Sequence, residues 1–195
     1  FYENGLKAVV PKLEFLFTPQ RFGGGMFNFL AMLHQAGVTT ALDMGTGIFG
    51  NPVGEIAGVR AAAQAYPVPV RLILTPIIVD FLTRGKTPEE ALAEILQWQT
   101  SNDDRVMVGN HFKLMIDGAI FSGLAQMGPP GYLDGHEGVW MVPEPVLRAY
   151  AEVFWRAGFQ LHAHANGDAA VDRFLRLVEG LQQDFPRPDH RSTIE

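Results

Sequence analysis

Two histidines at the carboxyl end of an apolar segment are the first candidates for a functional site. His162 and His164 stand two residues apart within Leu161–Ala165. We predict a strand over 159–164, and residues two apart in a strand point to the same face. Imidazole nitrogens are good ligands for zinc and similar ions. The pair therefore indicates either a metal site or a hydrogen-bonded structural pair, and the residues alone favour neither.

A lysine inside an apolar strand is the second candidate. Lys113 lies in the strand predicted over 112–117, on the same face as Met115 and Asp117. Burying an ammonium group is costly, so such a lysine needs a carboxylate partner or must lose its charge. A neutral lysine can react with CO2 to give an anionic carbamate that bridges two metal ions. From the residues alone we favour the structural interpretation, in which Lys113 reaches the rim of the sheet or pairs with Asp117.

Four other polar residues have simpler interpretations. Asp168 stands where a helix begins, and we interpret it as the N-cap of that helix. Asp43 ends an early strand and is interpreted as a cap of the loop that follows. His136 and Trp140 lie in a long loop over 119–142. We interpret both as surface or packing residues, although His136 would touch a substrate if this loop covers a site.

Short apolar strands alternating with longer amphipathic helices must position these residues. This alternation is typical of βαβ units and a mostly parallel sheet. We predict strands over 38–44, 70–78, 112–117, 159–164 and 190–195, and helices over about 18–35, 52–66, 87–98, 143–158 and 168–181. An open doubly wound sheet and part of a closed eight-stranded barrel both fit. The last strand favours the barrel, because an α/β domain rarely leaves the outer face of its final strand bare.

Composition narrows the class of protein. The chain has 195 residues, of which 47% are hydrophobic and 18% charged, so it can build the core of one domain over 1–195. The net charge is −6 and no basic stripe is visible, so we expect no nucleic-acid partner. No apolar run reaches the roughly 18–20 residues of a membrane span. Cysteine is absent, which excludes disulfides and thiolate metal sites. We expect a cytoplasmic protein.

Three motifs in this order resemble the amidohydrolase superfamily. They are Phe112–Gly118, His162–Asp168 and Thr193–Glu195, and the segment Gln35–Asp43 is similar to the second barrel strand of that group. The nearest branch is amidohydrolase-3, which includes N-substituted formamide deformylases. The resemblance implies an α/β fold, a (β/α)8 TIM barrel, with one or two divalent metal ions, usually zinc. It also implies hydrolysis of an amide or related C–N bond by a metal-activated water.

The resemblance assigns roles to particular residues. Lys113 matches the lysine that becomes a carboxylated, metal-bridging ligand, and His164 matches a histidine ligand. His162 is an additional histidine on the same face, expected to assist the metal or the substrate. We also expect Asp117, His136 and Trp140 to contact a small-molecule substrate.

Several parts of the family pattern are not found in this sequence. The H-x-H pair of the first strand, the histidine that follows the I-E pair, and the aspartate of the eighth strand are missing. We therefore expect a partial barrel with about strands 2–6 of a longer enzyme, inactive alone, with weak or no metal binding. Exposed sheet edges would favour a homo-oligomer. The alternative is a non-enzymatic α/β binding or interaction module.

Overall fold

The structure is a computed structural model that describes residues 9–16 and 18–195. The chain divides into two compact units, one formed by Phe1–Pro76 and Glu94–Gly109, the other by Ile77–Ala93 and Asn110–Glu195. In the part that the structure describes, none of the helices combines the length and the apolar character needed to cross a bilayer. The prediction of a single domain over 1–195 stays a prediction.

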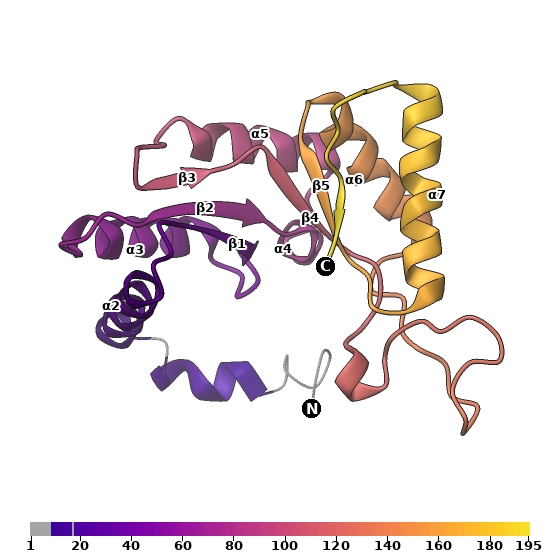
Figure 1. Cartoon of the computed structure of the whole chain (residues 1–195), viewed down its shortest axis with the longest axis horizontal. Helices are drawn as coiled ribbons and strands as arrows, with labels where there is room; N and C mark the ends of the chain where they lie inside the picture. Colours follow the sequence, from indigo (N-terminus) through magenta and orange to yellow (C-terminus); the bar gives the residue numbers. More distant parts are fainter. Residues whose placement is uncertain (1–8, 17) are drawn as a thin grey trace. The chain divides into compact units, whose positions relative to one another are not determined.

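The first unit contains a parallel sheet of three strands in the order β1-β2-β3 (Figure 1). The strands are β1 (Thr40–Thr46), β2 (Arg71–Pro76) and β3 (Val106–Val108). A 3-10 helix, η1 (Val10–Leu16), and two α-helices, α2 (Pro19–Gln35) and α3 (Pro52–Ala65), precede or connect them. Helix α2 begins where expected, because the Thr18 hydroxyl accepts a hydrogen bond from Arg21 N. Helix α5 (Pro88–Gln99) contributes residues to both units.

The second unit contains another parallel sheet, in the order β4-β5-β6. Its strands are β4 (His111–Met115), β5 (Gln160–His164) and β6 (Thr193–Ile194). Its helices are α4 (Ile78–Thr83), the 3-10 helix η2 (Ile120–Ser122), α6 (Glu144–Arg156) and α7 (Asp168–Asp184). Parallel strands joined by helices confirm the predicted α/β class.

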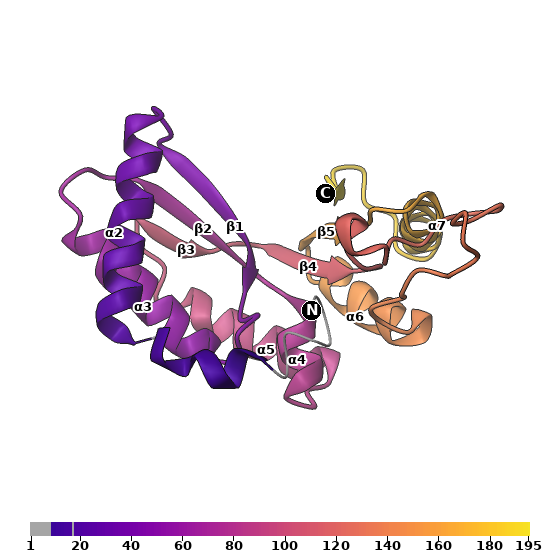
Figure 2. The same cartoon turned by 90° about the horizontal axis from the view of Figure 1, so that it is seen from below.

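Aromatic packing covers one face of the second sheet. In Figure 2, α6 and α7 stand beside each other next to β5, and α6 contacts both β4 and β5. Phe112 is fully buried and stacks on Phe154 with ring centroids 3.6 Å apart. Because side chains alternate along a strand, this packing leaves Lys113 of β4 on the opposite face.

Two of the predicted strands differ most in extent from the structure, and the short strand β3 was not predicted. The strand expected over 70–78 ends at Pro76, and Ile78 begins helix α4 instead. Ile77 and Ile78 are both buried, so their apolar character suits a packed helix start as well as a strand. The strand expected over 190–195 is reduced to β6, Thr193–Ile194.

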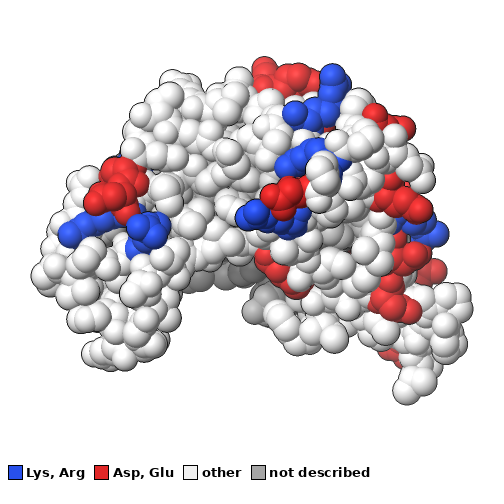
Figure 3. Space-filling view, turned by 45° about the horizontal axis from the view of Figure 1, so that its top comes forward, with Lys and Arg blue, Asp and Glu red and all other residues white. Residues whose placement is uncertain are grey.

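Charged side chains on the surface occur in small groups of both signs. On the face drawn in Figure 3, Lys and Arg side chains stand next to Asp and Glu side chains, with neutral surface between the groups. Arg148 on α6 and Asp184 on α7 form one such exposed pair at 2.6 Å. Exposed pairs of this kind contribute little to stability, so the apolar cores must carry most of it.

Candidate functional site

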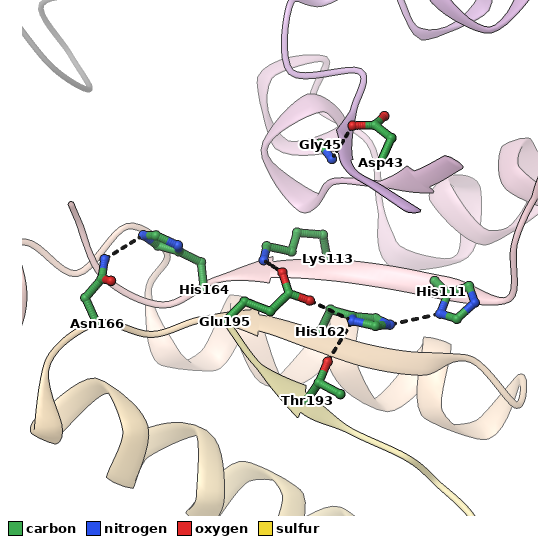
Figure 4. A network of polar contacts seen from close by, with 9 residues as sticks. All are labelled: Asp43, Gly45, His111, Lys113, His162, His164, Asn166, Thr193 and Glu195. Carbon is green, nitrogen blue, oxygen red and sulfur yellow. Dashed lines mark hydrogen bonds and ion pairs between the residues drawn. The ribbon is translucent and has the colours of Figure 1, made fainter. Parts of the chain in front are cut away.

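One face of the β4-β5-β6 sheet carries three of the polar residues that the sequence singled out, Lys113, His162 and His164 (Figure 4). In the parallel register Lys113 is opposite His162, and Met115 is opposite His164. Since residues opposite each other in a register share a face, Lys113, His162 and His164 all point to the same side. The strand alternation predicted this shared face correctly.

Lys113 is buried and forms an ion pair with Glu195. Its side-chain Nζ lies 2.5 Å from Glu195 Oε2, and the residue is 5% exposed. The backbone of Glu195 is hydrogen-bonded to Ala163 O in β5 and to Ala165 N just after it. Burial raises the pKa of Glu195, but hydrogen bonds from Lys113 and His162 outweigh burial and hold that pKa below its usual value. The predicted partner Asp117 and the predicted position at the rim are therefore both wrong.

His162 is buried and uses both ring nitrogens. Its Nε2 lies 2.9 Å from His111 Nδ1, and its Nδ1 lies 2.9 Å from Glu195 Oε1. The hydroxyl of Thr193 is also 2.7 Å from Nδ1. Burial, and then the proximity of His162, lower the pKa of His111. In this arrangement His162 presents neither nitrogen to a metal ion or a substrate, which favours the structural interpretation of this histidine.

His164 lies at the end of β5 and contacts the loop that follows. Its Nε2 is 2.8 Å from Asn166 Nδ2, and the same amide nitrogen donates to Gly118 O at 3.0 Å. The carbonyl of Gly118 fixes which side of the Asn166 amide is the nitrogen, because a carbonyl oxygen only accepts. His164 Nε2 therefore accepts a hydrogen bond from Asn166.

Asp117 organises the loops after β4 and β5. The residue is fully buried, and its carboxylate accepts hydrogen bonds from Gln126 N at 2.8 Å, Asn166 N at 2.9 Å and Gly167 N at 2.8 Å. A carboxylate that accepts three backbone N–H groups is firmly positioned, which is typical of a structural role. The expected contact between Asp117 and a substrate does not fit this burial.

Asp168 is the first residue of α7 and not its cap. The N-cap position is Gly167, with no side-chain cap bond. The Asp168 carboxylate instead accepts a hydrogen bond from Gly128 N at 2.7 Å, which ties the long loop to the start of α7. The expected capping role is thus wrong, although the residue is structural. Asp43 does cap its loop, as predicted, by accepting from Gly45 N (Figure 4) and also from Thr46 Oγ1.

The two loop residues expected to contact a substrate are held by other protein groups. His136 has Nδ1 2.5 Å from Asp134 Oδ1 and Nε2 2.7 Å from Gly123 O. The hydrogen bond to Asp134 raises the pKa of His136. The Trp140 ring lies under the guanidinium of Arg173, with the guanidinium carbon 3.2 Å from the ring centroid. These contacts give both side chains a role in holding the loop.

The metal site implied by the resemblance can be tested on the donor groups present. Within residues 9–16 and 18–195, no group of three or more His, Asp or Glu side chains is arranged to hold a metal ion. His162 is engaged through both nitrogens, and Lys113 is paired with Glu195. The described residues alone therefore do not fit a metal ion, since zinc sites take three or four protein ligands.

Three contributors to this face were missed from the sequence. His111, Thr193 and Glu195 join Lys113 and His162 in one network. Strand alternation contains the signal for His111, because it stands two residues before Lys113. Glu195 and Thr193 reach the network only through the pairing of β6 with β5, which no local pattern reveals.

Comparisons with known proteins agree with the resemblance of the motifs. The profile of the amidohydrolase family (Amidohydro_3) matches residues 4–195. An uncharacterized metal-dependent hydrolase from Pyrococcus furiosus has a TM-score of 0.59 at 18% identity, over 85% of this chain and 32% of that chain. A second, from Pyrococcus horikoshii OT3, has a TM-score of 0.60 at 16% identity, over 84% and 31%.

At these identities the two structures show a shared fold alone, and the chain spans about a third of their length. The chain matches none of the curated proteins with which it was compared. The family assignment rests on the profile, which covers almost the whole sequence and includes all three motifs. The chain belongs to the amidohydrolase family.

Proposed function

We propose that the protein is a metal-dependent hydrolase that cleaves an amide or a related C–N bond of a small molecule. The observation that carries this proposal is the placement of Lys113 and His164 on one face of a parallel sheet, near the carboxyl ends of adjacent strands. In α/β folds that end of the strands is where active sites are built. Membership of the amidohydrolase family supports the same reaction class.

The proposed architecture is a partial (β/α)8 barrel with about strands 2–6, whose inner wall includes the face of Lys113 and His164. Two solved structures of metal-dependent hydrolases with the same fold support it, although this chain covers only 32% and 31% of them. The metal would be zinc or another divalent ion, one or two per site. Because the described residues do not complete a ligand set, the site would need further ligands from elsewhere in the protein.

Within the proposed site, the chain's own residues have separable tasks. Lys113, after conversion to its carbamate, and His164 would be the groups that it contributes toward the metal. Asp117 holds the loops after β4 and β5 in place, and Asp168 anchors the long loop to α7. Residues 1–195 alone are expected to show no turnover.

Hydrolysis assays test this proposal. They use the intact protein, meaning the longer chain in which we propose that residues 1–195 form part of the barrel. N-substituted formamides, the substrates suggested by the motif resemblance, are compared with N-acyl amino acids, with and without a chelator. We expect release of amine that the chelator abolishes, that zinc restores, and that Lys113→Met reduces by orders of magnitude. Lys12→Met is the matched control, because Lys12 is exposed. Hydrolysis that persists in Lys113→Met or under chelation would contradict the proposal.

A further inference from the structure

Four side chains on one face of the second sheet form a continuous chain of hydrogen bonds. His111 Nδ1 is 2.9 Å from His162 Nε2, and His162 Nδ1 is 2.9 Å from Glu195 Oε1. The other oxygen of the same carboxylate, Oε2, is 2.5 Å from Lys113 Nζ. Figure 4 shows the four side chains following one another along this face.

The carboxylate fixes the donor at His162, and a neutral His162 ring then fixes the direction of its contact with His111. An ionised carboxylate only accepts, so the Nδ1 of His162 must carry a hydrogen and donate it to Glu195. In a neutral imidazole the other nitrogen then accepts, so His162 Nε2 receives a hydrogen bond from His111 Nδ1. Lys113 has donors only and points to the same carboxylate from the other side.

Backbone pairing makes Glu195 a fixed anchor for this chain. Glu195 N donates to Ala163 O at 2.9 Å, and Ala165 N donates to Glu195 O at 3.3 Å. The carboxylate therefore projects from a segment aligned with β5, next to His162. The Thr193 hydroxyl, 2.7 Å from His162 Nδ1, also borders this contact.

We propose that His162 is a positioning residue, which is held by His111 and in turn holds the Glu195 carboxylate against the Nζ of Lys113. Lysine has a long flexible stem, so a fixed carboxylate selects one direction for its amine. His162 is then neither a metal ligand nor a substrate contact. The reason why the direction of Lys113 matters rests on the proposed function. The assignment of donor and acceptor along the chain from His111 to Lys113 does not.

The competing role for His162, as a ligand, would disrupt this chain. Binding a metal through Nε2 would remove the acceptor of the His111 N–H, and binding through Nδ1 would remove the donor to Glu195. Leaving a buried polar group without its partner costs more than the hydrogen bond itself contributes. His162 is 4% exposed, so water cannot easily replace either partner.

Nitrogen NMR of the histidine rings tests the proposed order directly. Long-range 1H–15N spectra of the 15N-labelled protein, with its six histidines, report which ring nitrogen carries hydrogen. For the neutral rings that the proposed hydrogen-bond chain requires, we expect both His162 and His111 as Nδ1–H tautomers. An Nε2–H tautomer or a doubly protonated ring at His162 would overturn the proposal, and the unmodified protein suffices for this result.

Glu195→Gln provides a second, directional test. The Lys113 ammonium requires the oxygen of the new amide, so the amide nitrogen would face His162 and donate to its Nδ1. We expect His162 to change to the Nε2–H tautomer and His111 to change with it. Glu179→Gln, an exposed substitution on α7, should leave both tautomers unchanged. A Glu195→Gln protein that is folded but keeps the original tautomers would contradict the directional chain.

The effect on Lys113 is measured by amine labelling and rescue. Reductive methylation of Lys113, relative to the exposed Lys12, is read by mass spectrometry in two variants. His162→Leu should increase the relative labelling of Lys113 severalfold, whereas His162→Asn, which keeps an N–H near the position of Nδ1, should restore protection. Equal labelling in the two variants would refute the positioning role. The hydrolysis assays are independent of these measurements. If His162 and His111 have the expected Nδ1–H tautomers but the protein shows no turnover, only the proposed function is refuted.

Discussion

The carboxylate of Asp117 joins the ends of two strands through backbone hydrogen bonds. Asp117 follows β4. Its carboxylate accepts hydrogen bonds from the backbone N–H groups of Gln126 in the long loop and of Asn166 and Gly167 after β5. Asn166 in turn contacts His164. Asp117 was expected to touch a substrate. It instead holds the backbone of Asn166, whose side chain contacts His164.

Asp117→Asn is expected to destabilise the protein by about 2–4 kcal/mol, because an amide replaces one accepting oxygen with a donor that faces backbone N–H groups. Urea denaturation monitored by circular dichroism measures the change. The matched control is Asp104→Asn, since Asp104 is exposed, and it should change stability by less than about 0.5 kcal/mol. Similar changes in the free energy of unfolding for the two variants would show that the backbone hydrogen bonds of Asp117 do not stabilise the fold.

Glu195 gives a pH-dependent prediction at the same scale. Its pKa is lowered in the folded chain, so its ion pair stabilises the fold fully above the pKa of the unfolded state. This contribution is lost as the pH falls from that value through the lowered folded pKa. Melting temperatures of the wild type and Glu195→Gln should therefore differ most near neutral pH and converge in acid. A difference that stays constant from neutral pH to about pH 3 would be inconsistent with this linkage.

The start of α7 depends on a close approach between two loops. A Cβ at Gly167 would lie 1.8 Å from the carbonyl oxygen of Gln126, which is closer than any real contact allows. We expect Gly167→Ala to cost about 1–3 kcal/mol and to displace the long loop. Gly25→Ala in α2 is the control, because nothing lies within 4 Å of its added Cβ. It should stabilise the protein by about 0.5–1 kcal/mol, and an equally mild effect at Gly167 would contradict the packing described.

Local patterns predicted most of the elements and the shared face of the site. The period of two in 112–117 and 159–164 placed Lys113, His162 and His164 correctly, since a strand fixes the direction of each side chain. Local patterns could not predict hydrogen-bond and ion-pair partners that are distant in the sequence. Asp168 bonds to Gly128 and not to its own helix, and Lys113 pairs with Glu195 and not with nearby Asp117. Both contacts depend on which strands and loops become neighbours in space.

At the scale of the whole molecule, the chain forms two parallel sheets with their helices, and the partial barrel, the substrate and the metal are proposals. A small-molecule substrate and association of copies into a homo-oligomer likewise stay predictions. Exposed apolar side chains on α2, such as Phe29 and Met32, are compatible with further packing partners. The non-enzymatic alternative has lost support, because the family profile spans residues 4–195.

The most direct test of the central claim is the divalent metal content of the intact protein, measured by mass spectrometry of the elements after dialysis. We expect about one or two bound ions per wild-type chain, and severalfold weaker retention in Lys113→Met and in His164→Phe. Lys12→Met and, because His162 is assigned to positioning, His162→Asn should retain the metal. Full metal retention in Lys113→Met and His164→Phe, or no metal in the intact wild type, would contradict a metal site built on Lys113 and His164.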